Sequence, residues 1–214
     1  AAFAGELARI PASVSEPIVG EMRLQWWRDT LDAGLATPPG GDAPGHPVAR
    51  AIIAAARRRA LPIDALLAVI DAQSGRLEDQ PFADQTALET NVRCWDGGLF
   101  DLAWMIVEGV HRQGPPPALL GDSGVVYGIA RILAEASIDR MHGRILVPKV
   151  LGAASGARAD LVDTAVDAVA WRAALDATAD DTEQRFSRLR ASYQVASPAV
   201  RLAALPIALV RPYL

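Results

Sequence analysis

Residues 130–148 read ARILAEASIDRMHGRILVP, an apolar-periodic run that stops at a Gly-Arg pair and a proline. Within it, Glu135 and Asp139 are four residues apart, so on a helix their carboxylates share one face. Such a pair can bind Mg²⁺, especially where a diphosphate supplies further oxygen ligands. Acidic pairs at this spacing are also common on solvated helix turns. Spacing alone therefore leaves a metal site and a solvated surface both open.

Basic residues crowd the same end of this helix, among them Arg131, Arg140 and Arg144. Guanidinium groups suit phosphate because they bind its oxygens in pairs. Arg131 is also four residues from Glu135, the spacing of an ordinary intrahelical ion pair. The arginines can thus be phosphate ligands or partners of the nearby carboxylates.

The composition of the 214 residues indicates a helical globular protein. Hydrophobic residues make up 51% of the chain and charged residues 21%, which permits a substantial core. Strong helix formers are frequent, and no strand-length alternation of Val, Ile, Thr and aromatic residues recurs. Since the loops are short and no linker divides the chain, we expect one all-α domain over residues 1–214.

Charge and cysteine content narrow the class of protein. A formal charge of -4 argues against a nucleic-acid partner. Cys94 is the one cysteine, which excludes an internal disulfide, and we expect a reducing, cytoplasmic location. No apolar stretch approaches the roughly 20 residues that span a bilayer, although peripheral membrane contact stays open. The chain starts at Ala1 in a helical pattern, and we expect its natural N-terminal segment to be missing.

Ser15-Glu16-Pro17 predicts a helix start. One face of the helix that begins there carries, close together, Ile18, Met22, Trp26 and nearby Leu31. Trp26 and its neighbour Trp27 point about 100° apart, so both can be buried only at the edge of a wide apolar face. We predict core packing for the tryptophans, with the flanking arginines reaching them or nearby carboxylates.

Gly97 and Gly98 lie in the middle of a long helical pattern that begins at Asp84. A glycine inside a helix costs about 1 kcal/mol. The pair therefore predicts a kink, or the close approach of a neighbour or ligand.

The opening stretch, extended to YGIARILAEASIDRMHGRILVP (residues 127–148), resembles the block around the second Asp-rich motif of the squalene/phytoene synthase family. GEMRLQWWRDTLDA (20–33) is similar to the helix after the first motif and is the more specific match. CWDGGLFDLAWMIVEGV (94–110) resembles the central glycine-bearing helix, and AALPIALVRPYL (203–214) the C-terminal end. These matches cover most of the chain.

The resemblance implies an isoprenoid-synthase-like helical bundle. In that family, two facing helices carry Asp-rich motifs that hold Mg²⁺, and the metal ions bind prenyl diphosphates that react in an apolar cavity. The resemblance places five residues as candidates for lining this cavity: Leu99, Leu102, Trp104, Ile129 and Leu133.

This sequence departs from the family pattern at the acidic positions of the second motif. Glu135 and Asp139 match its first and last acids. Ala134 stands in place of an arginine, Arg131 of an asparagine and Ile138 of an acid.

The first motif departs further. Ala8 and Arg9 stand at its acidic positions with only Glu6 nearby, and Arg76 aligns with another family aspartate. One acidic pair is a poor Mg²⁺ site. We therefore expect no cofactor, with Mg²⁺ at Glu135 and Asp139 only if the chain is an active enzyme.

The pattern resembles the branch of the family that includes mitochondrial complex I assembly factors. The leading hypothesis is a non-catalytic member that binds a protein partner, an isoprenoid or a lipid phosphate. The alternative is a Mg²⁺-dependent prenyltransferase that joins two prenyl diphosphates head to head.

The first hypothesis predicts a retained cavity with a basic rim led by Arg131, Arg140 and Arg144, with Arg76 as a further candidate for head-group binding. The competing expectation is a pocket filled by tryptophans, with the arginines paired to the acids.

Overall fold

The computed structural model describes residues 1–38, 45–77, 82–111, 114–141 and 165–214. These residues form helices, with no strand among them, as the all-α prediction requires. In chain order the elements are α1 (Ala2–Ala12), α2 (Pro17–Ala36), α3 (Pro47–Arg59), α4 (Ile63–Ser74), α5 (Gln85–Val92), η1 (Arg93–Gly97), α6 (Gly98–Glu108), η2 (Gly109–His111), α7 (Ala118–Met141), α9 (Ala165–Val195), α10 (Pro198–Ala203), η3 (Leu205–Leu209) and α11 (Val210–Tyr213).

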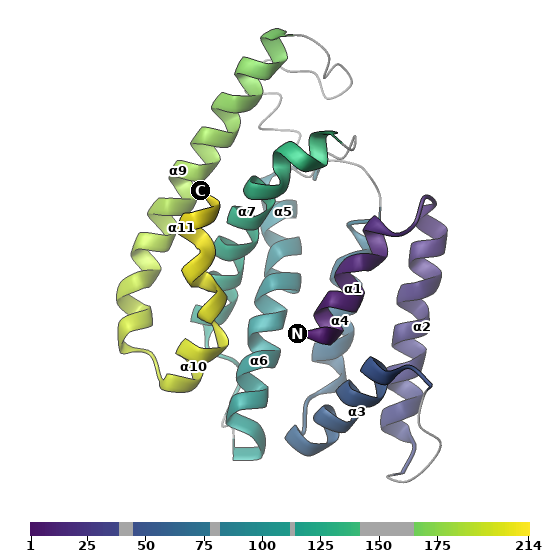
Figure 1. Cartoon of the computed structure of the whole chain (residues 1–214). Coiled ribbons are helices and arrows are strands. Elements are labelled where there is room, and N and C mark those ends of the chain that lie inside the picture. The colour runs from purple at the N-terminus through teal and green to yellow at the C-terminus, as the bar shows by residue number, and fades with distance from the viewer. Residues whose placement is uncertain (39–44, 78–81, 112–113, 142–164) are drawn as a thin grey trace.

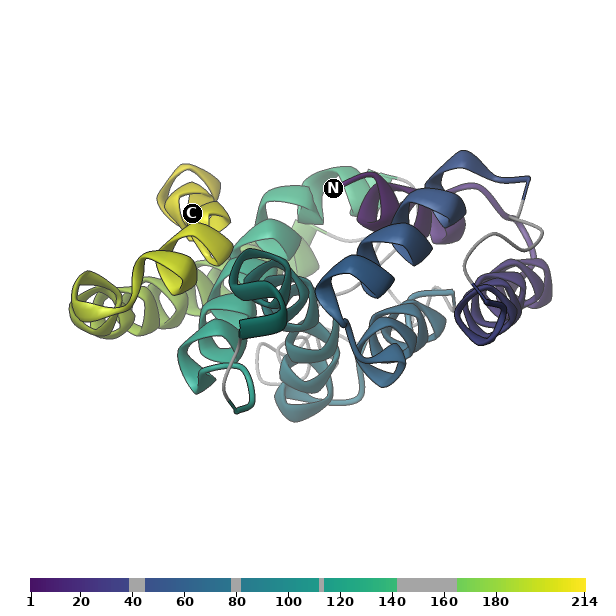
Figure 2. The ribbon, with the colours of Figure 1, turned by 90° about the horizontal axis from the view of Figure 1, so that it is seen from below.

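Most of the long helices run up and down beside one another (Figure 1). Seen from below, they form an elongated row with α2 at one end and α9 at the other (Figure 2). The helix made of α5, η1 and α6 stands in the middle of the row, next to α7. This central pair of helices positions the polar groups of the candidate site.

The central helix runs without interruption from α5 through η1 into α6. It begins where the Asp84 carboxylate accepts a hydrogen bond of 2.8 Å from the Ala87 amide, so the predicted start of this helix is confirmed. Its middle turn, η1, is a π-helix that contains Asp96 and Gly97. Single π-turns inside α-helices are rare overall, and those that occur are often found at functional sites.

Glycines allow α7 to approach this π-turn closely. A Cβ atom on Gly97 would lie 3.3 Å from the Cα atom of Gly121, and one on Gly124 would overlap the Gly97 backbone. On the other side, a Cβ atom on Gly98 would lie 2.9 Å from a methyl group of Val69 in α4. The close approach predicted from the glycine pair is therefore confirmed.

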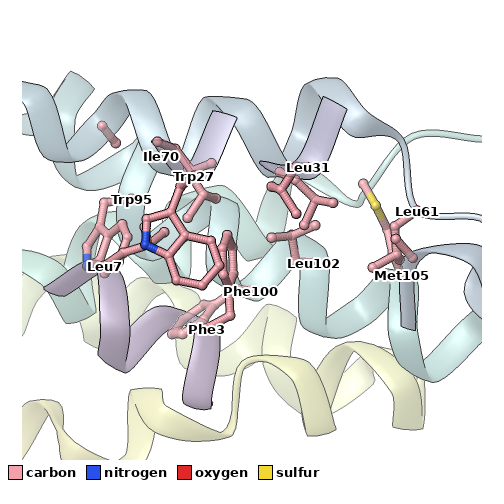
Figure 3. Close-up of a cluster of buried hydrophobic side chains, with 14 of the residues drawn as sticks. Phe3, Leu7, Trp27, Leu31, Leu61, Ile70, Trp95, Phe100, Leu102 and Met105 are labelled. Carbon is pink, nitrogen blue, oxygen red and sulfur yellow. The ribbon is translucent and has the colours of Figure 1, made fainter. Parts of the chain in front are cut away.

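A buried apolar cluster joins α1, α2, α4 and α6 (Figure 3). The rings of Phe3 and Trp27 meet edge-on, with their centroids 5.4 Å apart. The figure labels Phe3, Leu7, Trp27, Leu31, Leu61, Ile70, Trp95, Phe100, Leu102 and Met105. Because α1 buries its large apolar side chains here, its small residues are left to face another part of the bundle.

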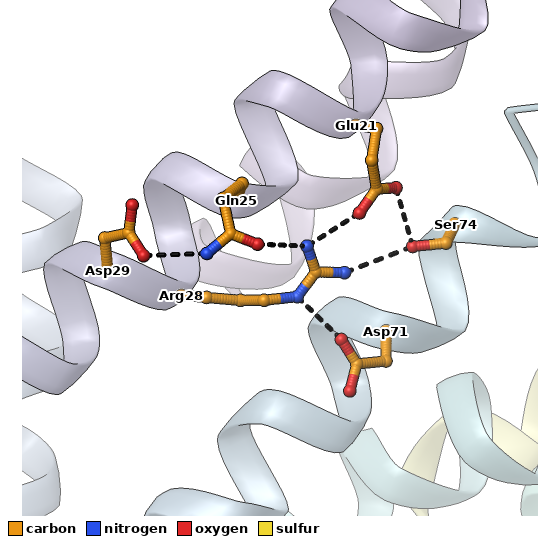
Figure 4. A network of polar contacts seen from close by, with 6 residues as sticks. All are labelled: Glu21, Gln25, Arg28, Asp29, Asp71 and Ser74. Carbon is orange, nitrogen blue, oxygen red and sulfur yellow. Dashed lines mark hydrogen bonds and ion pairs between the residues drawn. The ribbon is translucent and has the colours of Figure 1, made fainter.

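Arg28 of α2 forms hydrogen bonds to residues of α4 (Figure 4). Its Nε donates to an Asp71 oxygen at 2.7 Å, and its Nη1 donates to a Glu21 oxygen at 2.7 Å. Ser74 accepts from Nη2 at 3.2 Å and donates to the other Glu21 oxygen at 2.9 Å. Burial lowers the pKa of Arg28, but Asp71 and Glu21 outweigh burial and the net direction is upward. The network fixes which face of α2 points outward.

The tryptophan prediction was only half right. Trp27 and Leu31 are buried, whereas Trp26, Ile18 and Met22 lie on the outward face of α2. Successive residues on a helix differ by 100°, and the core accepts only one of the two directions.

Candidate functional site

A cavity of about 420 Å³ lies between α1, η1 and α7. The wall made by α1 consists of small or apolar residues, which are Ala4, Gly5, Ala8, Pro11 and Ala12. Ala8 is one of the positions where the resemblance had placed an acid. This wall therefore brings no carboxylate to the cavity.

The facing wall collects the polar groups. It is lined by Arg76, Trp95, Asp96, Leu99, Tyr127, Arg131 and Glu135. Tyr127, Arg131 and Glu135 are spaced by four residues along α7, so one helix face presents all three. The described lining thus carries two arginines and two carboxylates.

Asp96 and Arg131 form a buried ion pair at the centre of this wall. Arg131 Nη2 lies 3.2 Å from the Asp96 Oδ2 atom, and the two side chains are only 16% and 3% exposed. Arg131 Nη1 lies 3.1 Å from a Glu135 oxygen on the next turn. Gly128 makes room for the pair, because a Cβ atom at this position would overlap the Asp96 carboxylate.

Burial and charge act in opposite directions on this pair. Burial raises the pKa of Asp96, and the positive charges of Arg131 and Arg76 offset that effect only in part. Burial lowers the pKa of Arg131, but the carboxylates of Asp96 and Glu135 outweigh it and raise the pKa overall. Arg131 therefore stays protonated, and the neighbouring carboxylates balance its positive charge inside the protein.

Tyr127 borders the same cavity with its phenol in the protonated form. Burial, with contributions from Tyr213 and Asp96, raises the pKa of Tyr127 to about 12. Its ring packs 5.7 Å from the ring of Phe100. A side-chain hydrogen bond with Tyr213 also favours the protonated phenol, so Tyr127 links α7 to α11 at the edge of the cavity.

Comparison with known proteins now places the chain. The squalene/phytoene synthase family model matches residues 1–214. The chain belongs to the squalene/phytoene synthase family.

Curated relatives include "NADH dehydrogenase (ubiquinone) complex I, assembly factor 6" of Bos taurus, which is 38% identical over 149 residues. The protein of the same name from Homo sapiens is 33% identical over 149 residues. Both alignments cover 69% of this chain and 42% of the relative. The chain thus matches less than half the length of these relatives.

Two solved structures share the fold of this family member. A squalene synthase from Alicyclobacillus acidocaldarius superposes with a TM-score of 0.78 at 18% identity, over 99% of this chain and 78% of that one. A dehydrosqualene synthase in complex with a ligand gives 0.67 at 17% identity, over 98% and 72%. The predicted isoprenoid-synthase-like bundle is confirmed.

The cavity residues do not fit the Mg²⁺ ions that catalytic members of the family use. Glu135 is engaged by Arg131, Asp96 is buried behind the same guanidinium, and the α1 wall has no carboxylate. Within the described part of the chain, no group of three or more His, Cys, Asp and Glu side chains is placed to hold a metal ion. Mg²⁺ needs several oxygen ligands free to coordinate it, and in the described lining Arg131 already binds one oxygen of each carboxylate.

The structure brings four of the predicted site residues to the cavity: Arg76, Arg131, Glu135 and Leu99. The predicted basic rim is not found at Arg131, because its charge is balanced by two carboxylates. Asp139 and Arg140 belong to the last turn of α7, but their side chains are outside the described part, and Arg144 is outside the described residues altogether.

For the other four predicted lining residues the structure corrects the prediction, because none of them borders this cavity. Leu102 and Trp104 are buried in the main core. Ile129 is buried in a second apolar cluster, which Leu133 packs against. Ile129 and Leu133 are each two residues from Arg131, about 200° around the helix, so α7 turns them away from the cavity.

Sequence reasoning missed Asp96 and Tyr127 as site residues. A signal for Asp96 was present, because an acid directly before two glycines in an apolar helix needs a buried partner. For Tyr127 the spacing of four residues to Arg131 was the available signal.

None of the helices in the described ranges is both long and apolar enough to cross a bilayer.

Proposed function

We propose that this family member acts by binding a protein partner during assembly of respiratory complex I, and that it does not condense prenyl diphosphates. The observation that carries the proposal is the pairing of Arg131 with both Asp96 and Glu135 across from a wall without carboxylates.

This pairing opposes the family's reaction for a physical reason. A diphosphate leaving group needs strong positive charge that is free to bind it. The Arg131 charge is already compensated, and a diphosphate that took Arg131 would leave Asp96 buried without its partner, which is costly. The site therefore resembles a structural ion pair more than a leaving-group site.

The assembly role is supported by the relatives named complex I assembly factor 6, which share 31–38% identity with this chain over 149 residues. Since those proteins are longer than the matched region, their activity is extended to this chain as a proposal. A cytoplasmic location belongs to the same proposal.

An isoprenoid or lipid-phosphate ligand in the cavity is the less supported hypothesis. The volume of about 420 Å³ and the apolar α1 wall favour it. The balanced charge of the lining opposes binding of an anionic head group without metal. The same balance makes the head-to-head prenyltransferase hypothesis weaker still.

Deletion of the gene in the organism that carries it tests the assembly role. We expect NADH:quinone oxidoreductase activity of the membranes to fall and subcomplexes to accumulate, with recovery when the full chain is returned. Full activity and fully assembled complex I in the deletion strain would contradict the proposal.

A paired variant separates assembly from Mg²⁺-dependent catalysis. Glu135→Gln combined with Asp139→Asn removes both candidate metal ligands at nearly constant size. We expect this variant to restore complex I as well as the unmodified chain does. Loss of rescue by a variant that still folds would favour the enzyme.

A further inference from the structure

The outward face of α2 carries a stripe of large apolar side chains. Ile18, Met22 and Trp26 follow one another at intervals of four residues, and they are 67%, 67% and 44% exposed. Such spacing places them on one helix face. α2 stands at the end of the row of helices (Figure 2). Ile18 and Met22 point to solvent there, and Trp26 lies at the edge of the stripe, next to α1 and the start of α3.

The stripe leads into a second cavity of about 350 Å³ between α1, α2 and the start of α3. Three aromatic rings meet there. Trp26 lies 5.1 Å from Trp27 and 5.6 Å from His46, and Trp27 lies 5.3 Å from His46, all edge-to-face. This cavity shares no lining residue with the candidate functional site.

The mouth of this second cavity is basic. Arg9, Arg23 and the acidic Glu6 line it, so the arginines exceed the acid by one, and Glu6 lies 3.6 Å from Arg9. Arg23 donates to the Ser13 hydroxyl at 2.8 Å, which leaves other guanidinium N–H groups available. His46 Nδ1 is buried, and none of the described residues makes a hydrogen bond to it.

We propose that this surface, made of the α2 stripe and the aromatic cavity beside it, docks an amphipathic, acidic segment of a partner protein. The segment's apolar face covers Ile18 and Met22, and one apolar side chain enters the cavity beside Trp26. A carboxylate of the segment pairs with Arg9 and Arg23. The proposal rests on the proposed function only for the presence of a protein partner.

Residue type and shape favour a protein over a membrane. Tryptophan and arginine around a concave, partly desolvated pocket are the residues that most often carry binding energy in protein interfaces. A bilayer is disfavoured by shape, because its flat surface cannot place a side chain in the cavity between α1, α2 and α3, whereas one side chain of a peptide segment can enter it.

Selection from a library of random 16-residue peptides displayed on phage tests the surface, with the full chain as bait. We expect enriched peptides to combine Asp or Glu with aromatic or aliphatic residues at helical spacing. Their affinity, measured by calorimetry with synthetic peptides, should fall by about tenfold or more for Trp26→Ala and for Arg23→Glu. Val195→Ser changes an exposed apolar residue on α9 and should leave affinity unchanged.

Several results would overturn the proposal. The selection could enrich no peptides, or enrich basic ones. The peptide affinity could be unaffected by Trp26→Ala in a variant with unchanged helical content. Alternatively, the surface could form a dimer of this chain, or bind phosphatidylglycerol vesicles, in a way that Met22→Ser abolishes. If the deletion strain loses complex I but Trp26→Ala and Met22→Ser restore it fully, this docking surface fails while the proposed function stands.

Discussion

Arg131 of α7 reaches across to Asp96 in the π-helical turn and holds its carboxylate at 3.2 Å, with both side chains largely hidden from water. The pair joins the two central helices and stands in the wall of the main cavity. The positive charge of Arg131 is thus balanced inside the fold, by a carboxylate on the neighbouring helix and by one on its own helix.

Removal of the arginine should destabilise the protein strongly. Arg131→Leu leaves Asp96 buried without its partner, and we expect the free energy of unfolding to fall by about 3 kcal/mol. Chemical denaturation monitored by circular dichroism measures this change.

Two controls distinguish the ion pair from lost packing. Asp96→Asn in the Arg131→Leu background should recover at least about 1 kcal/mol, because no buried charge remains. Glu135→Ala removes the more exposed partner and should cost less than about 1 kcal/mol. If the single substitutions at Arg131 and Glu135 lower the free energy of unfolding equally, the buried Asp96 charge is not the cause of the loss.

Gly128 should be intolerant of a side chain. A Cβ atom there would overlap the Asp96 carboxylate and lie 2.8 Å from the Cβ atom of Val92, so Gly128→Ala should destabilise the fold by about 2 kcal/mol. Gly5→Ala is the matched control, because no atom outside its own helix lies within 4 Å and alanine favours a helix. Thermal melting of both variants should show opposite shifts, and equal losses would refute the close-approach account.

Local signals explain how far the fold could be predicted. The helix start predicted at Asp84 is confirmed, since its carboxylate accepts a hydrogen bond from the Ala87 amide at 2.8 Å, and Ser197 caps α10 in the same way, with 3.3 Å to the Val200 amide. The π-turn could not be derived in the same way, because it depends on the approach of α7 through Gly124 and its neighbours.

The candidate site was predicted only in part for a related reason. Helical spacing offered the Arg131–Glu135 pair as one of two alternatives, and the structure contains this pair within one helix. It could not show that Asp96 on another helix completes the pair. Likewise the spacing gave the angle between Trp26 and Trp27 but not which of them the core would accept.

Asp101 in α6 should make stability depend on pH. Burial raises the pKa of Asp101 to about 6, with the charge of Arg93 opposing. One of its carboxylate oxygens is buried without a hydrogen-bond partner among the described residues. Because the folded-state pKa lies above the unfolded value, the protonated form favours folding. The stabilisation is complete below about pH 4 and is lost as the pH rises through about 6.

Asp101→Asn removes this dependence. At pH 7.5 we expect the variant to be more stable than the unmodified protein by about 1 kcal/mol, since water screens part of the effect at this half-buried side chain. At pH 4 the two proteins should be equally stable. Urea denaturation at both pH values gives the comparison, and a difference that is the same at pH 4 and pH 7.5 would exclude Asp101 as the cause.

The central claim is that the internal Arg131 has replaced the metal–diphosphate site. Titration calorimetry of the full chain with inorganic diphosphate tests this claim most directly. The measurement is made with and without Mg²⁺, on the unmodified protein and on Asp139→Ala. We predict no Mg²⁺-dependent heat of binding and no difference between the two proteins. Tight diphosphate binding that requires Mg²⁺ and disappears in Asp139→Ala would contradict the account.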